Sequence, residues 1–180
     1  MRGWLDMQTE PIGIPDSGKE LICTMQGPGT NLGKVGEFEI LLREAFFNNE
    51  EALRFILDVF AAAHVWDDLV DGDAVTQAQF QRTFRDLFLE IPTNPFYIKH
   101  FTALHPIILN SMLNWEAANR MEMEKKGNDL RIAYILRSSF IDLVGVTAFL
   151  LGGYEHAVQV VLKMRRIEHS ESLEEYKETV

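Results

Sequence analysis

The sequence has a single cysteine, few basic residues and no long apolar run, and each of these absences excludes a class of protein. Because Cys23 is the only cysteine among 180 residues, no internal disulfide can form, and we expect a reducing, cytoplasmic location. The 17 basic residues against 27 acidic ones give a net charge of −10, which disfavours binding to the phosphate backbone of a nucleic acid. The nearest approach to a membrane span, residues 143–153, falls short of the roughly 18 apolar residues required. We therefore expect no nucleic-acid partner and no membrane span.

Strand-like alternation of apolar and polar residues is also missing beyond a few residues, whereas helical spacing of apolar residues begins at Gly33. We therefore predict an all-α fold, a single bundle of six to seven helices over residues 33–167. Residues 1–32 are rich in glycine and proline and predict an extended N-terminal arm that would lie across the body or join a homo-oligomer. Residues 168–180 predict a charged, frayed C-terminal tail.

Capping residues predict where several helices begin and end. The expected positions are Asn48 or Asn49 and Asn94 as N-caps, Pro95 as a first helical residue, and Gly72 as a stop. The helix after Gly72 carries an apolar stripe of Phe80, Phe84, Leu87 and Phe88. Pro106 is expected to kink or break a long helix that runs to about Lys126. A central helix is expected from Leu130 to Leu151, with Gly152–Gly153 as its end and a last helix over Tyr154–Ile167.

Four acidic residues fall within seven positions at the end of an apolar run. On a helix, His64, Asp67, Asp68 and Asp71 project from one face. Three carboxylates on one face repel each other and are costly to bury unless a positive charge lies between them. Oxygen ligands with one optional imidazole favour Mg²⁺, with Mn²⁺ as the second choice. The sequence therefore predicts a metal site at these four residues, and the alternative is a helix that frays into a solvated acidic turn.

The segment Trp66–Asp71 contains the pattern DDxxD at Asp67, Asp68 and Asp71. With its helical pattern, the chain resembles the isoprenoid (terpenoid) synthase superfamily, all-α enzymes that carry this motif on a core helix. The resemblance implies that the three aspartates bind Mg²⁺ ions that hold the diphosphate of an isoprenoid substrate. It also implies an aromatic interior that would shield a carbocation, with Phe60, Trp66, Phe84, Phe88, Trp115 and Phe140 as candidates.

The superfamily carries a second metal-binding set on a late helix, and the match to it is incomplete. Ser138 and Asp142 have the required i, i+4 spacing, but Tyr134 stands at the position of the family's asparagine. Asn114 is a further candidate for the outer shell of a metal. The candidates for binding a phosphate are Arg131, Arg165 and Arg166. The alternatives are an internal arginine–aspartate pair or a serine bonded to backbone, and a solvated basic helix end.

Two other functions stay open. The all-α nucleoside-triphosphate pyrophosphohydrolases also hold Mg²⁺ with acidic residues from several helices. Their usual pattern is ExxE, and Glu37 and Glu39 have the wrong spacing for it. The third interpretation is a non-catalytic binding or assembly protein whose acids hold a structural ion or pair with basic residues of a partner. The lack of a clear second ligand set favours this third interpretation, and no catalytic residue is predicted.

Overall fold

The computed structural model describes residues 32–169 and 172–179, and every regular element in those ranges is a helix. In chain order these are α2 (Leu32–Ala45), α3 (Glu50–Asp71), α4 (Gln77–Arg85), the π-helical turn η1 (Asp86–Glu90), α5 (Ile91–Thr93), α6 (Pro95–Glu124), α7 (Asp129–Leu136), α8 (Ile141–Glu168) and α9 (Leu173–Thr179). The predicted all-α bundle is confirmed. The predicted arm lies outside the described residues, except that Leu32 already begins α2.

The predicted caps are confirmed at both ends of α3 and at the start of α6. The side chains of Asn49 and Asn94 each accept a hydrogen bond from the backbone N–H three residues further along, over 2.9 and 3.0 Å. Pro95 is the first helical residue of α6, where its missing N–H costs nothing. Gly72 ends α3 with a left-handed backbone (φ 80°), which glycine adopts without strain.

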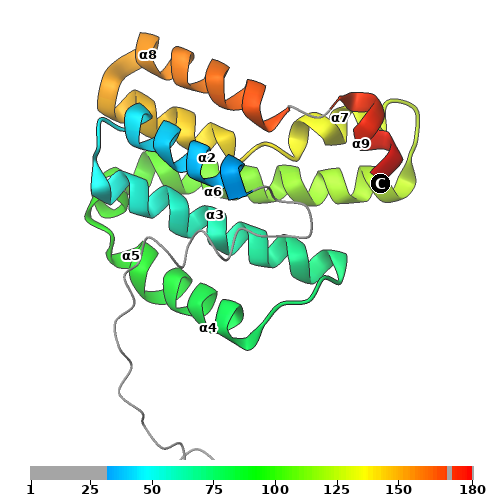
Figure 1. Cartoon of the computed structure of the whole chain (residues 1–180), viewed down its shortest axis with the longest axis horizontal. Helices are drawn as coiled ribbons and strands as arrows, with labels where there is room; N and C mark the ends of the chain where they lie inside the picture. The colour runs from blue at the N-terminus through cyan, green and yellow to red at the C-terminus, as the bar shows by residue number, and fades with distance from the viewer. Residues whose placement is uncertain (1–31, 170–171, 180) are drawn as a thin grey trace, which may run out of the picture.

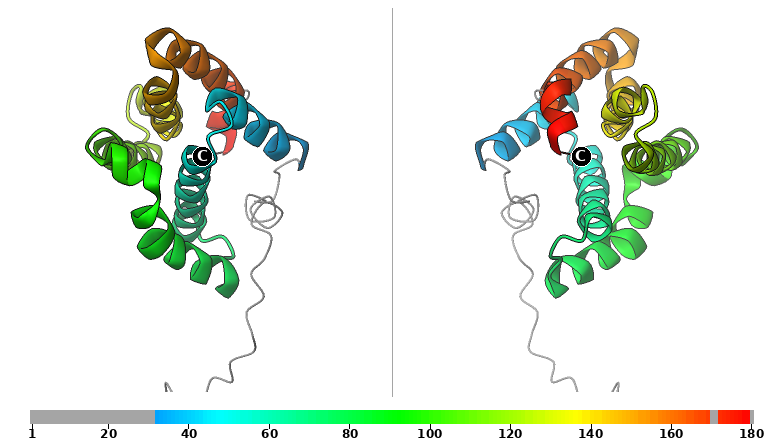
Figure 2. Two further views of the ribbon diagram at one scale, coloured as in Figure 1. Left: turned by 90° about the vertical axis from the view of Figure 1, so that its left-hand side faces the viewer. Right: turned by 90° about the vertical axis from the view of Figure 1, so that its right-hand side faces the viewer.

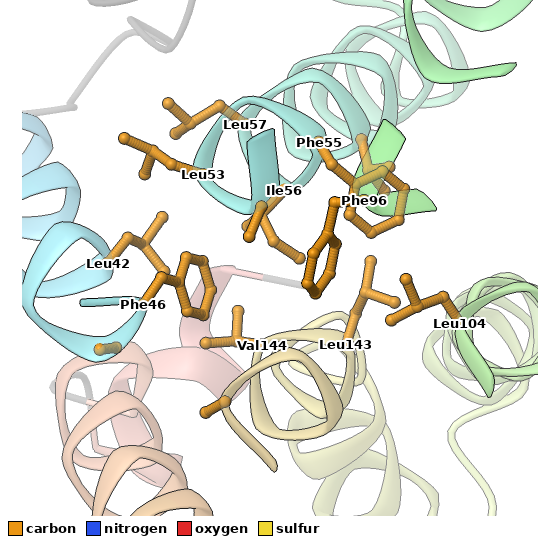
Figure 3. Close-up of a cluster of buried hydrophobic side chains, with 14 of the residues drawn as sticks. Leu42, Phe46, Leu53, Phe55, Ile56, Leu57, Phe96, Leu104, Leu143 and Val144 are labelled. Atoms are coloured by element: carbon orange, nitrogen blue, oxygen red, sulfur yellow. The ribbon is translucent and has the colours of Figure 1, made fainter. Parts of the chain in front are cut away.

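Helix α3 lies at the centre of the fold and packs against α2, α4, η1, α6 and α8 (Figure 1). Viewed from the end, α2 and α8 lie on one side of α3 and α4 lies on the other (Figure 2). Apolar side chains from four of these helices pack together and form the core (Figure 3). Its fully buried members include Leu42 and Phe46 of α2, Phe55 and Ile56 of α3, Leu104 of α6, and Leu143 and Val144 of α8.

The long helix α6 bends at a different place from the one predicted. Its non-helical residue is His100 (φ −114°, ψ 19°), whereas Pro106 lies within the helix. A proline removes one backbone hydrogen bond and its ring presses on the preceding turn, so the helix adjusts on the N-terminal side of the proline.

The single central helix predicted over residues 130–151 is wrong. Helix α7 ends at Leu136, and α8 begins only at Ile141. In the turn between them, the hydroxyls of Ser138 and Ser139 donate to backbone carbonyl oxygens three residues earlier, over 2.9 and 2.6 Å. Such side-chain bonds compete with the helical backbone ladder, which explains why the helix stops inside an apolar stretch.

Gly153 reverses the chain within α8, as the pair Gly152–Gly153 predicted. Its backbone is left-handed (φ 78°, ψ −174°), and the two halves of α8 fold back on each other (Figure 1). A Cβ atom on Gly145 would lie 2.6 Å from Val161 Cγ2, so any side chain at this position would force Val161 to move. By length and composition alone, α8 is apolar enough to cross a membrane (mean hydropathy 1.2), but neither half alone has the roughly 20 residues needed.

The predicted frayed tail is wrong for residues 173–179, which form α9. Tyr176 is 7 % exposed and packs in a small second core with Ala118 of α6 and Ala133 of α7. One buried aromatic residue therefore orders a segment whose other residues are mainly charged.

Candidate functional site

The aspartates lie at the C-terminal end of α3, where the helix itself offers them no positive charge. The N–H of Gly72 donates to the carbonyl oxygen of Asp68, which closes the last turn. That turn holds no basic residue, and the C-terminal end of a helix carries a partial negative charge. Carboxylates at this position therefore need cations from other parts of the fold.

Arg137 supplies such a cation to Asp67. Arg137 follows α7 in the turn before α8, and its Nη1 donates to Asp67 Oδ1 over 3.0 Å. The indole N–H of Trp115, in α6, donates to the same oxygen over 2.9 Å. The carboxylate of Asp67 thereby joins α3 to α6 and to the α7–α8 turn.

Arg137 also forms a two-pronged ion pair with Glu122 of α6. Its Nε donates to Glu122 Oε1 over 2.7 Å, and its Nη2 donates to Oε2. Glu122 is 9 % exposed and also accepts a hydrogen bond from the hydroxyl of Tyr176 in α9. The guanidinium carbon lies 5.4 Å from the ring centre of Trp115, within cation–π range. We call this set, Asp67, Trp115, Glu122, Arg137 and Tyr176, the Arg137 node.

The charges of the Arg137 node shift the pKa values of its members. Burial by itself would lower the pKa of Arg137, but the hydrogen bond and charge of Glu122, with the charge of Asp67, raise it above its usual value. Burial and the bond to Glu122 raise the pKa of Tyr176. Arg137 therefore stays positive and Tyr176 stays protonated in neutral solution.

The other two aspartates of the motif lie outside the Arg137 node. His64 Nε2 is 3.9 Å from Asp68 Oδ1, which is too far for a hydrogen bond. Asp71 lies at the surface; partial desolvation of its carboxyl, and then the charge of Asp67, raise its pKa. Within residues 32–169 and 172–179, no three His, Cys, Asp or Glu side chains are arranged to hold a metal ion. Binding of Mg²⁺ or Mn²⁺ by these residues therefore stays a prediction.

Ser138, Asp142 and Arg165 come together, but as an internal cluster. Arg165, in the second half of α8, donates to the carboxylate of Asp142 over 2.5 Å and to the carbonyl oxygen of Ser138 over 2.9 Å. The hydroxyl of Ser138 also accepts from Arg165 and lies 2.9 Å from His169 Nε2. Burial and the charge of Arg165 lower the pKa of His169. Asp142 therefore belongs to an internal arginine–aspartate pair, and its partner is Arg165 of the second half of α8 rather than Arg131.

The remaining predicted residues do not complete a shared site. Asn114 is half-buried, and Arg131 and Arg166 are exposed. Arg137 and Ser138 are neighbours in the chain, yet Arg137 bonds to α3 and α6 whereas Ser138 bonds to the second half of α8. Of the first predicted ligand set, Asp67 is therefore bonded to Arg137, whereas Ser138 and Asp142 of the second set are bonded to Arg165 in a separate cluster.

The predicted aromatic interior is wrong for Phe84 and Phe88, which lie on the outside of the molecule. The inner rings pack in pairs, Trp66 with Trp115 and Phe60 with Phe140. Helix α4 buries none of its residues. Phe80, Phe84, Leu87 and Phe88 are 52, 56, 48 and 63 % exposed, and we call these four residues the aromatic face. The sequence predicts the spacing of this stripe correctly, but the structure places the stripe on the surface and not in the interior.

A pair of buried carboxylates that the sequence analysis missed lies between α3 and η1. Asp58 and Asp86 are 4 % and 3 % exposed. Burial, and then the charge of Asp86, raise the pKa of Asp58 to about 7. Arg82 Nε lies 3.5 Å from Asp86 Oδ2, although neither atom has a hydrogen-bond partner within the described chain. An aspartate inside the apolar run Ile56–Phe60 was the signal that would have pointed to this pair.

A surface hollow of about 140 Å³ is lined by residues of α2 and of the second half of α8, and by none from the C-terminal end of α3 where the aspartates lie. Its polar lining includes Glu44, His156 and Lys163, and none of the predicted site residues lines it. It is smaller than the roughly 300–1,000 Å³ of typical ligand pockets. The hollow therefore does not coincide with the aspartate-rich segment.

No protein-family model, no curated protein and no solved structure matches the chain. Its function therefore has to be inferred from the geometry described above.

Proposed function

We propose that this protein is a non-catalytic binding protein, a helical scaffold that docks onto another protein surface through the aromatic face. The observation that carries this proposal is the exposed column of three phenylalanines on α4 and η1, beside Leu87. Soluble monomers rarely expose contiguous apolar patches larger than a few hundred Å², and such patches mark interaction sites. Helix α4 buries none of its residues, so packing within the fold does not account for the aromatic side chains of this segment.

The Arg137 node supports the same proposal. The carboxylate of Asp67, the first residue of DDxxD, already accepts hydrogen bonds from Arg137 and Trp115. A metal ion at Asp67 would lie against a guanidinium that Glu122 holds in place with two bonds. In this proposal the aspartate-rich segment stabilises the bundle and the aromatic face binds the partner.

A magnesium-dependent enzyme acting on an isoprenoid diphosphate is the second candidate, favoured by one observation. Partial burial and then the negative charge of Asp67 raise the pKa of Asp71, and Asp68 lies 3.9 Å from the imidazole of His64. Crowded carboxylates at the C-terminal end of a helix would be stabilised by a divalent cation. Such an ion would supply the charge that binds a diphosphate.

A thermal-shift titration separates the two candidates. The wild type, Asp68→Asn and the control Glu155→Gln, which removes an exposed acid on α8, are heated with Mg²⁺ or Mn²⁺, with and without pyrophosphate. A ligand that binds the folded state raises the melting temperature. The proposed function predicts no joint effect of metal and pyrophosphate in any of the three proteins. A joint rise in the wild type and in Glu155→Gln that is lost in Asp68→Asn would overturn it in favour of the enzyme.

A further inference from the structure

We infer that the partner on the aromatic face is a second copy of this chain, packed in antiparallel fashion about a two-fold axis next to Phe84. The inference rests on the proposed binding function and names the partner. It follows from the spacing, the charge and the area of the aromatic face.

The three phenylalanines form a continuous column. The ring centres of Phe80 and Phe84 are 6.2 Å apart, and those of Phe84 and Phe88 are 4.5 Å apart. On an α-helix, residues four apart drift by about 40° around the axis. Between Phe84 and Phe88 the chain enters η1, a π-helical turn that rotates less per residue and so opposes this drift. The π turn therefore keeps the third ring in line with the first.

A column of three identical side chains, at every fourth position of the chain, is complementary to itself. If two copies pack antiparallel with Phe84 at the centre, Phe80 of each copy meets Phe88 of the other. A two-fold interface places the same surface of both subunits in contact and requires this kind of self-complementarity. A column with one aromatic end and one polar end would not satisfy it.

The charges around the aromatic face permit self-association of an acidic protein. The chain carries a net charge of −10, yet α4 and η1 together carry two acidic residues, Asp86 and Glu90, against two arginines, and α4 itself contains no acidic residue. Its two arginines are each paired with Asp86, at 3.5 Å for Arg82 and 3.7 Å for Arg85. The face is therefore close to neutral, and two copies meet there without the like-charge repulsion expected elsewhere on the surface.

The apolar area of the face fits a dimer of ordinary size. Half-exposed phenylalanines present roughly 100 Å² each, and with Leu87 the face presents roughly 400 Å² per copy. A standard interface buries about 800 Å² per partner, somewhat more than half of it non-polar. The four residues therefore supply the apolar part, and the polar side chains beside them form the rim. Helix α4 lies at the edge of the bundle, away from α2 and α8, where a second copy has access (Figure 2).

The first test is the mass of the intact chain by sedimentation or light scattering. We expect twice the chain mass of 20.6 kDa for the wild type. Phe84→Glu places two charges at the centre of the interface and should lower the mass two-fold. The matched control is Tyr154→Glu, the same kind of change at a 69 % exposed aromatic residue on α8, which should leave the dimer intact. Equal helix content by circular dichroism shows that each variant is folded.

The second test checks the antiparallel register by disulfide crosslinking in a Cys23→Ser background. In this dimer, residue 84 lies beside residue 84 of the second copy across the two-fold axis, so the variant Phe84→Cys should crosslink to itself. Phe80→Cys and Phe88→Cys should each fail alone and crosslink when the two proteins are mixed. Self-crosslinking of Phe80→Cys without that of Phe84→Cys would overturn the antiparallel arrangement.

The outcomes for the dimer and for the proposed function are distinguishable. A wild-type chain that is monomeric at every concentration overturns the inference, whatever the metal titration gives. A metal-dependent pyrophosphate effect lost in Asp68→Asn overturns the proposed function, whatever the mass. A monomer with no such effect would leave a binding protein whose partner is a different chain.

Discussion

Arg137 is the residue whose loss should destabilise the bundle most through electrostatics, and Arg137→Met is the variant that tests this. Methionine keeps much of the length and apolar stem of arginine but carries no charge. The substitution removes both bonds to Glu122, the bond to Asp67 and the cation–π contact with Trp115. The carboxylates of Glu122 and Asp67 then lose the guanidinium that neutralised them.

The expected loss comes mainly from Glu122. With 9 % of its surface exposed, Glu122 is in the regime where removing one partner of a buried ion pair costs about 3–5 kcal/mol. The side chain of Asp67 is 37 % exposed, so water screens its pair with Arg137 and that pair contributes about 1 kcal/mol or less. We therefore expect Arg137→Met to lower the free energy of unfolding by about 3–5 kcal/mol, and the melting temperature by roughly 10 °C.

Urea denaturation followed by circular dichroism and tryptophan fluorescence measures this loss. The matched control is Arg120→Met on α6, because Arg120 pairs with Glu116 at the surface (3.0 Å) and its loss should cost about 0.5 kcal/mol or less. Adding Glu122→Gln to Arg137→Met should restore part of the stability, since it removes the unpaired buried charge. Equal effects of Arg137→Met and Arg120→Met would refute the reasoning.

Two further predictions concern other parts of α3. The groups facing the carboxyl of Asp58 are Asp86 and Glu90 of η1, Arg54 of α3 and Arg82 of α4. The folded-state pKa of Asp58 is about 7, above its value in the unfolded chain, so the folded state binds more protons between about pH 4 and 7. The free energy of unfolding therefore falls as the pH rises through that range. Asp58→Asn should therefore stabilise the protein by up to about 4 kcal/mol at pH 8 and have little effect at pH 4, and equal effects at both pH values in urea denaturation would contradict this. Asn49→Ala removes the N-cap of α3 and should cost about 1 kcal/mol in the same assay, whereas an unchanged midpoint would show that the cap is dispensable.

The boundaries that the sequence predicts correctly depend on neighbours within one turn. Asn49 and Asn94 each bond to a backbone N–H three residues away, and Gly72 adopts a backbone conformation that its own lack of a side chain permits. Such signals are complete within a short window of sequence. The break between α7 and α8 is local as well, but it results from competition between the hydroxyls of Ser138 and Ser139 and the helical ladder. The apolar spacing continues through the break, so periodicity alone does not reveal it.

Whether an apolar stripe of a helix faces the core or the solvent depends on tertiary contacts. The spacing of Phe80, Phe84 and Phe88 defines one face of a helix, and an apolar face is ordinarily assigned to the core. Here the polar side of the helical segment faces α3 instead: Asp86 is buried near Asp58, and Arg54 of α3 donates a hydrogen bond to Glu90 of η1 over 2.8 Å. The packing of α4 and η1 on α3 therefore uses this polar side and leaves the phenylalanines outside, and no pattern within the segment encodes that choice.

The aspartate-rich segment shows that a motif can require positive charge without specifying which group supplies that charge. Three carboxylates at the C-terminal end of a helix require positive charge, and this requirement follows from the sequence alone. A metal ion and an arginine both meet it, and the choice depends on residues distant in sequence: Arg137 lies 70 positions from Asp67, and its orientation is fixed by Glu122. The second predicted ligand set repeats the pattern, because Asp142 is neutralised by Arg165. A DDxxD string therefore specifies a charge deficit: Arg137 fills the part of it at Asp67, and the titration with Mg²⁺ or Mn²⁺ tests whether an ion fills the rest at Asp68 and Asp71.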